Sequence, residues 1–141
     1  MRTPPIAAAG LTALAGLHLV WATGSTWPAA DAGAISGQPP GRSPGPVACT
    51  AVAGLLATAA ALVSGRPRSR PALARLGSAG VTATFAARGA LGLAGRTDLI
   101  SPGATSARFR ALDRRVYAPL CLALAALSAP ATAARPRTAP R

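Results

Sequence analysis

The chain has 141 residues, of which 50% are hydrophobic and only 13% are charged, and its mean hydropathy is +0.36. Because soluble domains carry about 25% charged residues, this composition excludes an ordinary soluble domain and indicates helices that pack closely in lipid. All 15 basic residues are arginines and give a net charge of +12, but they lie between apolar segments without accompanying aromatic residues, so no nucleic-acid partner is expected.

Four apolar segments predict four membrane-spanning helices, which cover residues 6–23, 47–64, 76–94 and 116–134. Each is long enough to cross a hydrocarbon core of roughly 30 Å at about 1.5 Å per residue. Pro46 and Gly65 bracket the second segment, as expected for a helix that begins with proline and ends before glycine. The third segment is the weakest span, because alanine and glycine contribute little transfer energy and Arg88 interrupts it.

The connecting segments are short or irregular. Residues 24–45 are rich in Gly, Pro, Ser and Ala and predict an irregular loop, whereas residues 135–141 predict a disordered basic tail. After Leu99, an arginine-rich amphipathic stretch runs directly into the last apolar segment. This stretch predicts a helix that lies in the membrane interface. The predicted fold class is therefore all-α, an integral membrane four-helix bundle in one domain of residues 1–134, with an amphipathic interfacial segment before the last helix.

The distribution of arginines predicts the orientation. With four spans, eight arginines fall on the side of the two termini and six on the other, which favours a multi-pass protein of the cell membrane with both termini in the cytoplasm. An alternative is that residues 6–20 are the apolar core of a signal peptide, cleaved near Ala30 or Ala32, which would leave three spans. Trp21 and Trp27 favour a retained helix, because tryptophan anchors helices at the membrane interface.

Four short motifs carry a family resemblance: His18-Leu-Val-Trp21-Ala22, Pro44-Gly45-Pro46, Arg88-Gly89, and Phe109-Arg-Ala-Leu-Asp113-Arg-Arg-Val-Tyr117-Ala-Pro119-Leu-Cys121-Leu. Together they resemble the small bacterial membrane proteins of the domain-of-unknown-function family 3995, over nearly the whole chain. The last motif is the most specific. The chain differs from the family pattern at Leu19–Val20, at Ser25 and in the shortened connection 95–106. The resemblance implies the four-helix plan and supplies no activity.

An up-down arrangement of four helices predicts a polar cluster near one membrane face, because the end of spans one and three and the start of spans two and four meet there. The candidate cluster consists of His18, Trp21, Arg88, Asp113, Tyr117 and Cys121. On a helix, Asp113, Tyr117 and Cys121 form a stripe, since they are spaced four residues apart. We expect Arg88 to pair with Asp113, with His18 or Tyr117 completing the hydrogen bonding.

Other interpretations of the same residues remain open. His18, Trp21 and Tyr117 are each typical of an interfacial belt, and Asp113 also offsets the neighbouring arginines. Cys49 and Cys121 lack the paired spacing of a zinc site. A disulfide between them depends on geometry that the sequence does not give, and free thiols are the favoured interpretation.

Catalysis has little support in the sequence. The chain has a single histidine, and it has no Ser-His-Asp set, paired carboxylates, phosphate-binding loop, or metal or cofactor motif. The leading prediction is a structural or accessory component of the bacterial inner membrane, with the lipid bilayer, a second copy or another membrane protein as partner. The alternative is a small transporter or sensor that binds an ion or small polar ligand at the polar cluster, and a membrane enzyme ranks third.

Overall fold

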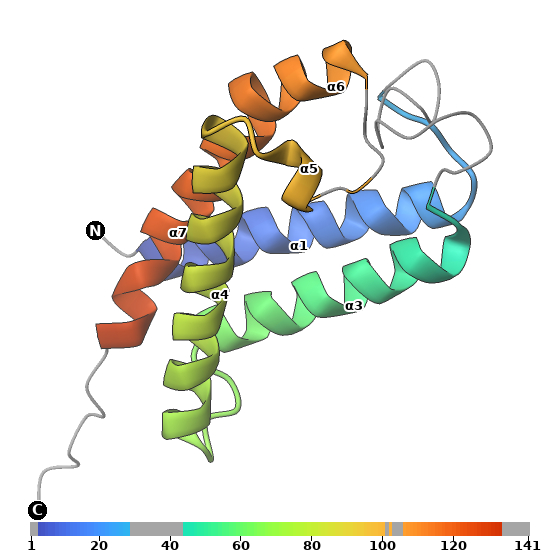
Figure 1. Cartoon of the computed structure of the whole chain (residues 1–141). Coiled ribbons are helices and arrows are strands. Elements are labelled where there is room, and N and C mark those ends of the chain that lie inside the picture. Colours follow the sequence, from blue (N-terminus) through green and yellow to red (C-terminus); the bar gives the residue numbers. More distant parts are fainter. Residues whose placement is uncertain (1–2, 29–43, 101, 103–105, 134–141) are drawn as a thin grey trace, which may run out of the picture.

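The computed structural model describes residues 3–28, 44–100, 102 and 106–133, and these residues form helices and turns without a strand (Figure 1). The helices are α1 (Thr3–Ala22), α3 (Pro46–Val63), α4 (Pro71–Leu93), α5 (Thr97–Ile100), α6 (Ala107–Leu112), the π-helical segment η1 (Asp113–Tyr117) and α7 (Ala118–Ala133). The all-α prediction is therefore confirmed for the described residues. The predicted basic tail and most of the predicted loop 24–45 lie outside them.

Proline and glycine set the ends of the two middle helices. Pro46 and Pro71 stand in the first turns of α3 and α4, where a missing N–H leaves no hydrogen bond unmade. Gly65 and Gly95 follow the two helices with φ of +77° and +74°, a conformation that side chains disfavour. The N–H of Arg66 donates to the Ala61 carbonyl, and that of Arg96 to the Leu91 carbonyl. These bonds complete the usual glycine C-cap and reverse the chain.

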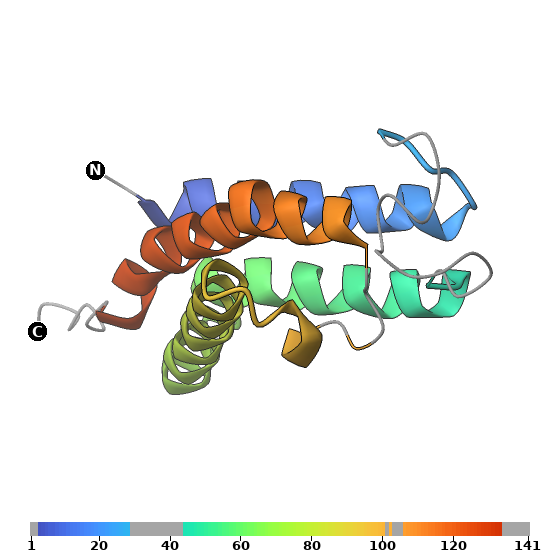
Figure 2. The same ribbon diagram turned by 45° about the horizontal axis from the view of Figure 1, so that its top comes forward.

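The helices form two closely packed pairs. The most extensive contacts join α1 to α3 and α4 to α7, with smaller contacts between α1 and α7 and between α3 and α4. The pairs meet over a buried apolar cluster from α1, α3 and α7: Ala7, Leu11, Ala59, Ala60, Val63 and Leu124. In both views α1 and α3 lie side by side, whereas α4 is steeply inclined to them (Figures 1 and 2). The predicted four-helix bundle is therefore not confirmed.

Three helices are long and apolar enough to cross a membrane: Thr3–Ala22, Pro46–Val63 and the continuous run Ala107–Ala133. The predicted third span coincides with α4, which is helical over 23 residues. Its mean hydropathy is too low to place it among these three helices, because it is rich in alanine and glycine and contains Arg75 and Arg88. The amphipathic stretch that was expected as a separate interfacial segment is the first part of the last helix. The three apolar helices indicate a membrane protein.

Glycine allows the two helices of the α4–α7 pair to approach closely. A Cβ atom built on Gly89 would lie 2.6 Å from Cγ of Leu122 and 2.9 Å from the backbone oxygen of Ala118. The leucine side chain can shift, but the carbonyl belongs to α7 itself and cannot move alone. Small residues at helix contacts are the usual basis of association in lipid, so Gly89 determines how near α7 lies to α4.

We expect Gly89→Ala to lower the thermal unfolding temperature of the detergent-solubilised protein, with a loss of about 1–3 kcal/mol from overpacking. Gly80→Ala is the matched control, because Gly80 is on the same helix and a Cβ there would meet nothing within 4 Å. Circular dichroism melting of both variants measures the difference. Equal unfolding temperatures of the two variants would show that close approach of α4 and α7 at Gly89 does not contribute to stability.

Candidate functional site

The pair expected from the sequence between Arg88 and Asp113 is present. Arg88 lies in α4 and donates a hydrogen bond from Nη2 to Oδ1 of Asp113, the first residue of η1. The Asp113 side chain is 0% exposed and that of Arg88 is 23% exposed. An isolated carboxylate buried in this way would be very unfavourable. The guanidinium therefore compensates a charge that has no contact with solvent.

Thr97 completes the hydrogen bonding of the carboxylate. Its Oγ1 donates to Oδ2 of Asp113 at 3.0 Å, and Thr97 is itself buried. Both carboxylate oxygens therefore have partners. The prediction that His18 or Tyr117 would fill this role was wrong, because Thr97 in α5 returns toward α4 after the reversal at Gly95.

Gly92 provides the space in which the pair lies. A Cβ atom built on Gly92 would be 2.9 Å from Nη1 of Arg88, 3.1 Å from Oδ2 of Asp113 and 2.8 Å from Cβ of Ala118. Gly92 follows Arg88 by one helical turn, so the two residues share a face of α4. The absent side chain at Gly92 thus makes room for the charged groups.

A π-helical turn alters the expected stripe on the last helix. The N–H of Ala118 donates to the carbonyl of Asp113, five residues earlier, whereas an α-helix would use a four-residue step. Asp113 is fully buried, but Tyr117 and Cys121 are half-buried. Tyr117 packs its ring on the buried ring of Phe109, with centroids 5.9 Å apart. Tyr117 therefore acts as a packing residue here, while Asp113 pairs with the guanidinium.

His18 and Trp21 form a separate group on α1. Their rings are 4.8 Å apart in an edge-to-face arrangement. His18 Nδ1 donates to the Leu14 carbonyl at 2.9 Å, and Trp21 Nε1 donates to the Trp27 carbonyl at 2.7 Å. Within the described residues, no hydrogen bond, ion pair or ring contact joins this group to the Arg88–Asp113 pair. The six candidate residues are thus not brought together as one cluster.

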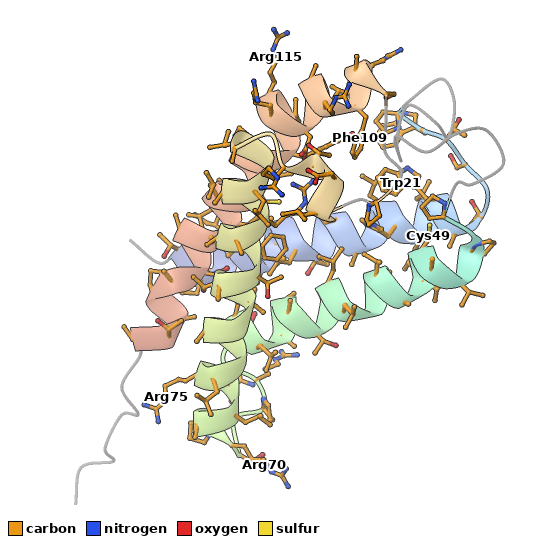
Figure 3. All side chains as sticks on the ribbon, in the orientation of Figure 1. Trp21, Cys49, Arg70, Arg75, Phe109 and Arg115 are labelled. Atoms are coloured by element: carbon orange, nitrogen blue, oxygen red, sulfur yellow. The ribbon has the colours of Figure 1, made fainter. Side chains whose placement is uncertain are left out.

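The two cysteines are both free. Cys49 is buried near the start of α3 and contacts the Pro44 carbonyl through Sγ at 3.8 Å. Figure 3 shows it at the same end of the α1–α3 pair as Trp21. Cys121 is half-buried on α7 and lies within electrostatic range of both Arg88 and Asp113. Among the residues that the structure describes, no group of three or more His, Cys, Asp or Glu side chains could hold a metal ion.

Residues 11–128 match the model of a family described as protein of unknown function, DUF3995. The chain belongs to the DUF3995 family. This confirms the resemblance seen in the sequence, and the matched region of this DUF3995 protein includes both the His18–Trp21 group and the Arg88–Asp113 pair. No curated protein and no solved structure matches the chain.

We expect Asp113→Asn to destabilise the protein by on the order of 3 kcal/mol, because the guanidinium of Arg88 would lose its compensating charge in a largely buried position. Asp98→Asn is the matched control. Asp98 pairs with Arg96 at 3.6 Å between two exposed side chains, and such pairs contribute no more than about 1 kcal/mol. Thermal unfolding in one detergent compares the two variants.

The double variant Arg88→Gln/Asp113→Asn provides a second control. Because neither charge remains, it should lose less stability than the sum of the two single variants. Additive losses would mean that the two residues act independently and that the ion pair does not hold α4 to the last helix.

Proposed function

We propose that this protein is a structural or accessory component of the bacterial inner membrane without enzymatic activity of its own. The observation that carries the proposal is the closed state of the charged pair. Asp113 is fully buried, and its two oxygens are occupied by Arg88 and Thr97. A catalytic or transport residue must be reachable by a substrate or ion, whereas a closed pair supports a role in holding helices together.

Two surface hollows support this interpretation. Their volumes are about 380 and 550 Å³. The first is lined by Ala72, Arg75, Leu76, Ala79 and Thr132, and the second by Thr58, Ala61, Leu62, Arg66, Pro67 and Arg68. Neither contains Arg88 or Asp113. Both are open to the surroundings, so they offer no enclosed path for a solute to the buried pair.

The outer face of α3 favours a partner helix. Thr50, Gly54 and Thr58 are all exposed and follow one another at four-residue intervals. A Cβ atom built on Gly54 would meet nothing within 4 Å. Both threonine hydroxyls donate to carbonyls of α3 itself, one turn earlier. Small residues at this spacing let a second helix approach closely in lipid, which suits a membrane protein partner or a second copy of the chain.

We expect Gly54→Leu to remove a stoichiometric partner that co-purifies with the wild-type protein from native membranes, because the larger side chain blocks close helix approach. Gly16→Leu is the matched control, since Gly16 is exposed on α1 and also has nothing within 4 Å of a built Cβ. Stoichiometry is measured by mass spectrometry of the purified complex. A wild-type protein that purifies alone as a monomer, or equal loss in both variants, would contradict the accessory role.

A small transporter or sensor is the second candidate. Nη1 of Arg88 is buried and has no hydrogen-bond partner among the described residues. Such a donor is suited to an ion or small polar ligand that accepts hydrogen bonds. This candidate requires ligand-dependent or pH-dependent behaviour that Arg88→Ala removes while helical content is retained. The accessory role predicts no such dependence.

Four crossings with both termini in the cytoplasm complete the proposal. The 23 residues of α4 reach about 34 Å at about 1.5 Å per residue, enough for a hydrocarbon core of roughly 30 Å. The charge of Arg88 is neutralised by Asp113, which reduces the penalty for placing it in lipid. Arg75 lies in the second turn of α4, where its side chain can extend to the interface.

We expect single cysteines at Gly37, Ser69 and Thr138, in a background without Cys49 and Cys121, to differ in labelling by a membrane-impermeant maleimide. Intact cells should label at Gly37 only. Labelling at both Gly37 and Thr138 would show that α4 does not cross and that the termini lie on opposite sides. Labelling at Ser69 and Thr138 would invert the protein. Gly37 and Thr138 lie outside the described residues.

A further inference from the structure

Three arginines of the last helix line a surface hollow of about 320 Å³, a size at the lower end of about 300–1,000 Å³ for small-molecule sites. We call this hollow the arginine pocket, and it is lined by Gly95, Thr97, Arg110, Ala111, Arg114 and Arg115. It lies between the reversal after α4 and the helical segments α6 and η1. The arginine pocket therefore combines a concave shape with several positive charges.

No carboxylate of the described residues compensates these arginines. The chain has three acidic residues, and Asp31 lies outside the described part. Asp113 is buried and occupied by Arg88 and Thr97, and Asp98 pairs with Arg96. Like charges held close together repel one another and attract an anion. The arginine pocket is thus an uncompensated cationic site.

Backbone conformation helps to assemble the arginine pocket. Gly95 has φ of +74°, and a Cβ atom there would lie 2.7 Å from Nη2 of Arg114. The guanidinium of Arg114 therefore lies over the glycine, in space that any other residue would occupy. Thr97, which also lines the pocket, is held by its hydrogen bond to Asp113. The close approach at Gly95 thus places the guanidinium of Arg114 against the turn that lines the arginine pocket.

Exposed apolar residues stand near the lining residues in the sequence. Leu99 on α5 is 57% exposed, and Val116 and Leu120 on the last helix are exposed as well. Residues 118–133 continue the helix as an apolar span. The pocket therefore lies where a charged segment meets an apolar one, which is the level at which lipid phosphates lie.

We propose that the arginine pocket binds a phosphoryl group, carried by the head group of an anionic phospholipid. Guanidinium groups bind phosphate oxygens through paired, charge-assisted hydrogen bonds. The lining arginines directly precede the apolar span Ala118–Ala133, and this position at the end of a span favours a lipid as the source of the phosphate. The inference is independent of the accessory role, since either proposal can fail without the other.

The test titrates the full-length protein in neutral detergent micelles with phosphatidylglycerol, phosphatidylcholine or inorganic phosphate, and measures bound lipid by native mass spectrometry and the shift in unfolding temperature. The pocket triple variant is R110Q/R114Q/R115Q. Its control, R66Q/R68Q/R70Q, removes the same charge from the turn between α3 and α4. Figure 3 shows Arg70 and Arg115 at opposite ends of the molecule.

Wild type should prefer phosphatidylglycerol to phosphatidylcholine. The pocket triple variant should bind phosphatidylglycerol more weakly by on the order of a hundredfold, from the usual contribution of each arginine near an anionic lipid surface, whereas the control triple should stay within a few fold of wild type. Ala111→Glu, which keeps every arginine and places a carboxylate at the exposed lining residue, should weaken binding as well. This second variant tests the site if the triple variant does not fold.

Three outcomes would overturn the proposal. Equal weakening in the pocket and control triple variants would mean that only net charge attracts the lipid. Equal binding of phosphatidylglycerol and phosphatidylcholine by wild type would mean that no anionic site exists. The third outcome is that inorganic phosphate raises the unfolding temperature as much as phosphatidylglycerol does at equal concentration. If that shift is lost in the pocket triple variant, the site binds free phosphate.

Discussion

Burial of the Asp113 carboxylate is the constraint on which the rest of the structure depends. A carboxylate without solvent contact is tolerated only when an opposite charge and hydrogen-bond donors replace water. Arg88 and Thr97 supply these groups from α4 and α5, so two separate segments must converge on η1. Gly92 has to lack a side chain for this to happen, because the guanidinium and the carboxylate fill the space beside it. One buried charge thus determines the contact between α4 and the last helix and the return of the chain through α5.

The segment η1 carries two kinds of charge that are adjacent in sequence but lie in different surroundings. Asp113 faces the interior, whereas Arg114 and Arg115 are exposed. An electrostatic account based on sequence neighbours would pair this aspartate with those arginines. Instead Arg88 neutralises it from 25 positions earlier, which leaves the arginines of η1 without a counter-ion among the described residues. The surface at η1 is positively charged because Arg88, and not Arg114 or Arg115, compensates the buried Asp113.

The sequence was sufficient for features that depend on composition and local chemistry. Apolar length located the four long helices, although α4 begins at Pro71 and the last helix at Ala107, both before the predicted segments. The pairing of Arg88 with Asp113 was predictable because an arginine within an apolar helix needs an anion, and acids are scarce in this chain. The roles of Thr97 and Gly92 and the inclination of α4 to α1 and α3 were not predictable. They depend on how the chain reverses at Gly95 and on close packing between helices distant in sequence. His18 and Trp21 were misplaced for the same reason, since an ideal up-down bundle assumes parallel axes.

The buried pair and the arginine pocket share η1 and Thr97, and this links structure to the proposed ligand. Thr97 contacts Asp113 with its hydroxyl and also lines the pocket, while Asp113 and Arg114 are consecutive residues of η1. Any displacement of the carboxylate therefore moves the pocket wall. Coupling of this kind is reciprocal, so a ligand that organises the pocket stabilises the pair by as much as the pair favours ligand binding. A lipid phosphate held here would consequently strengthen the contact between α4 and the last helix, and the protein would be most stable in a membrane that supplies such a head group.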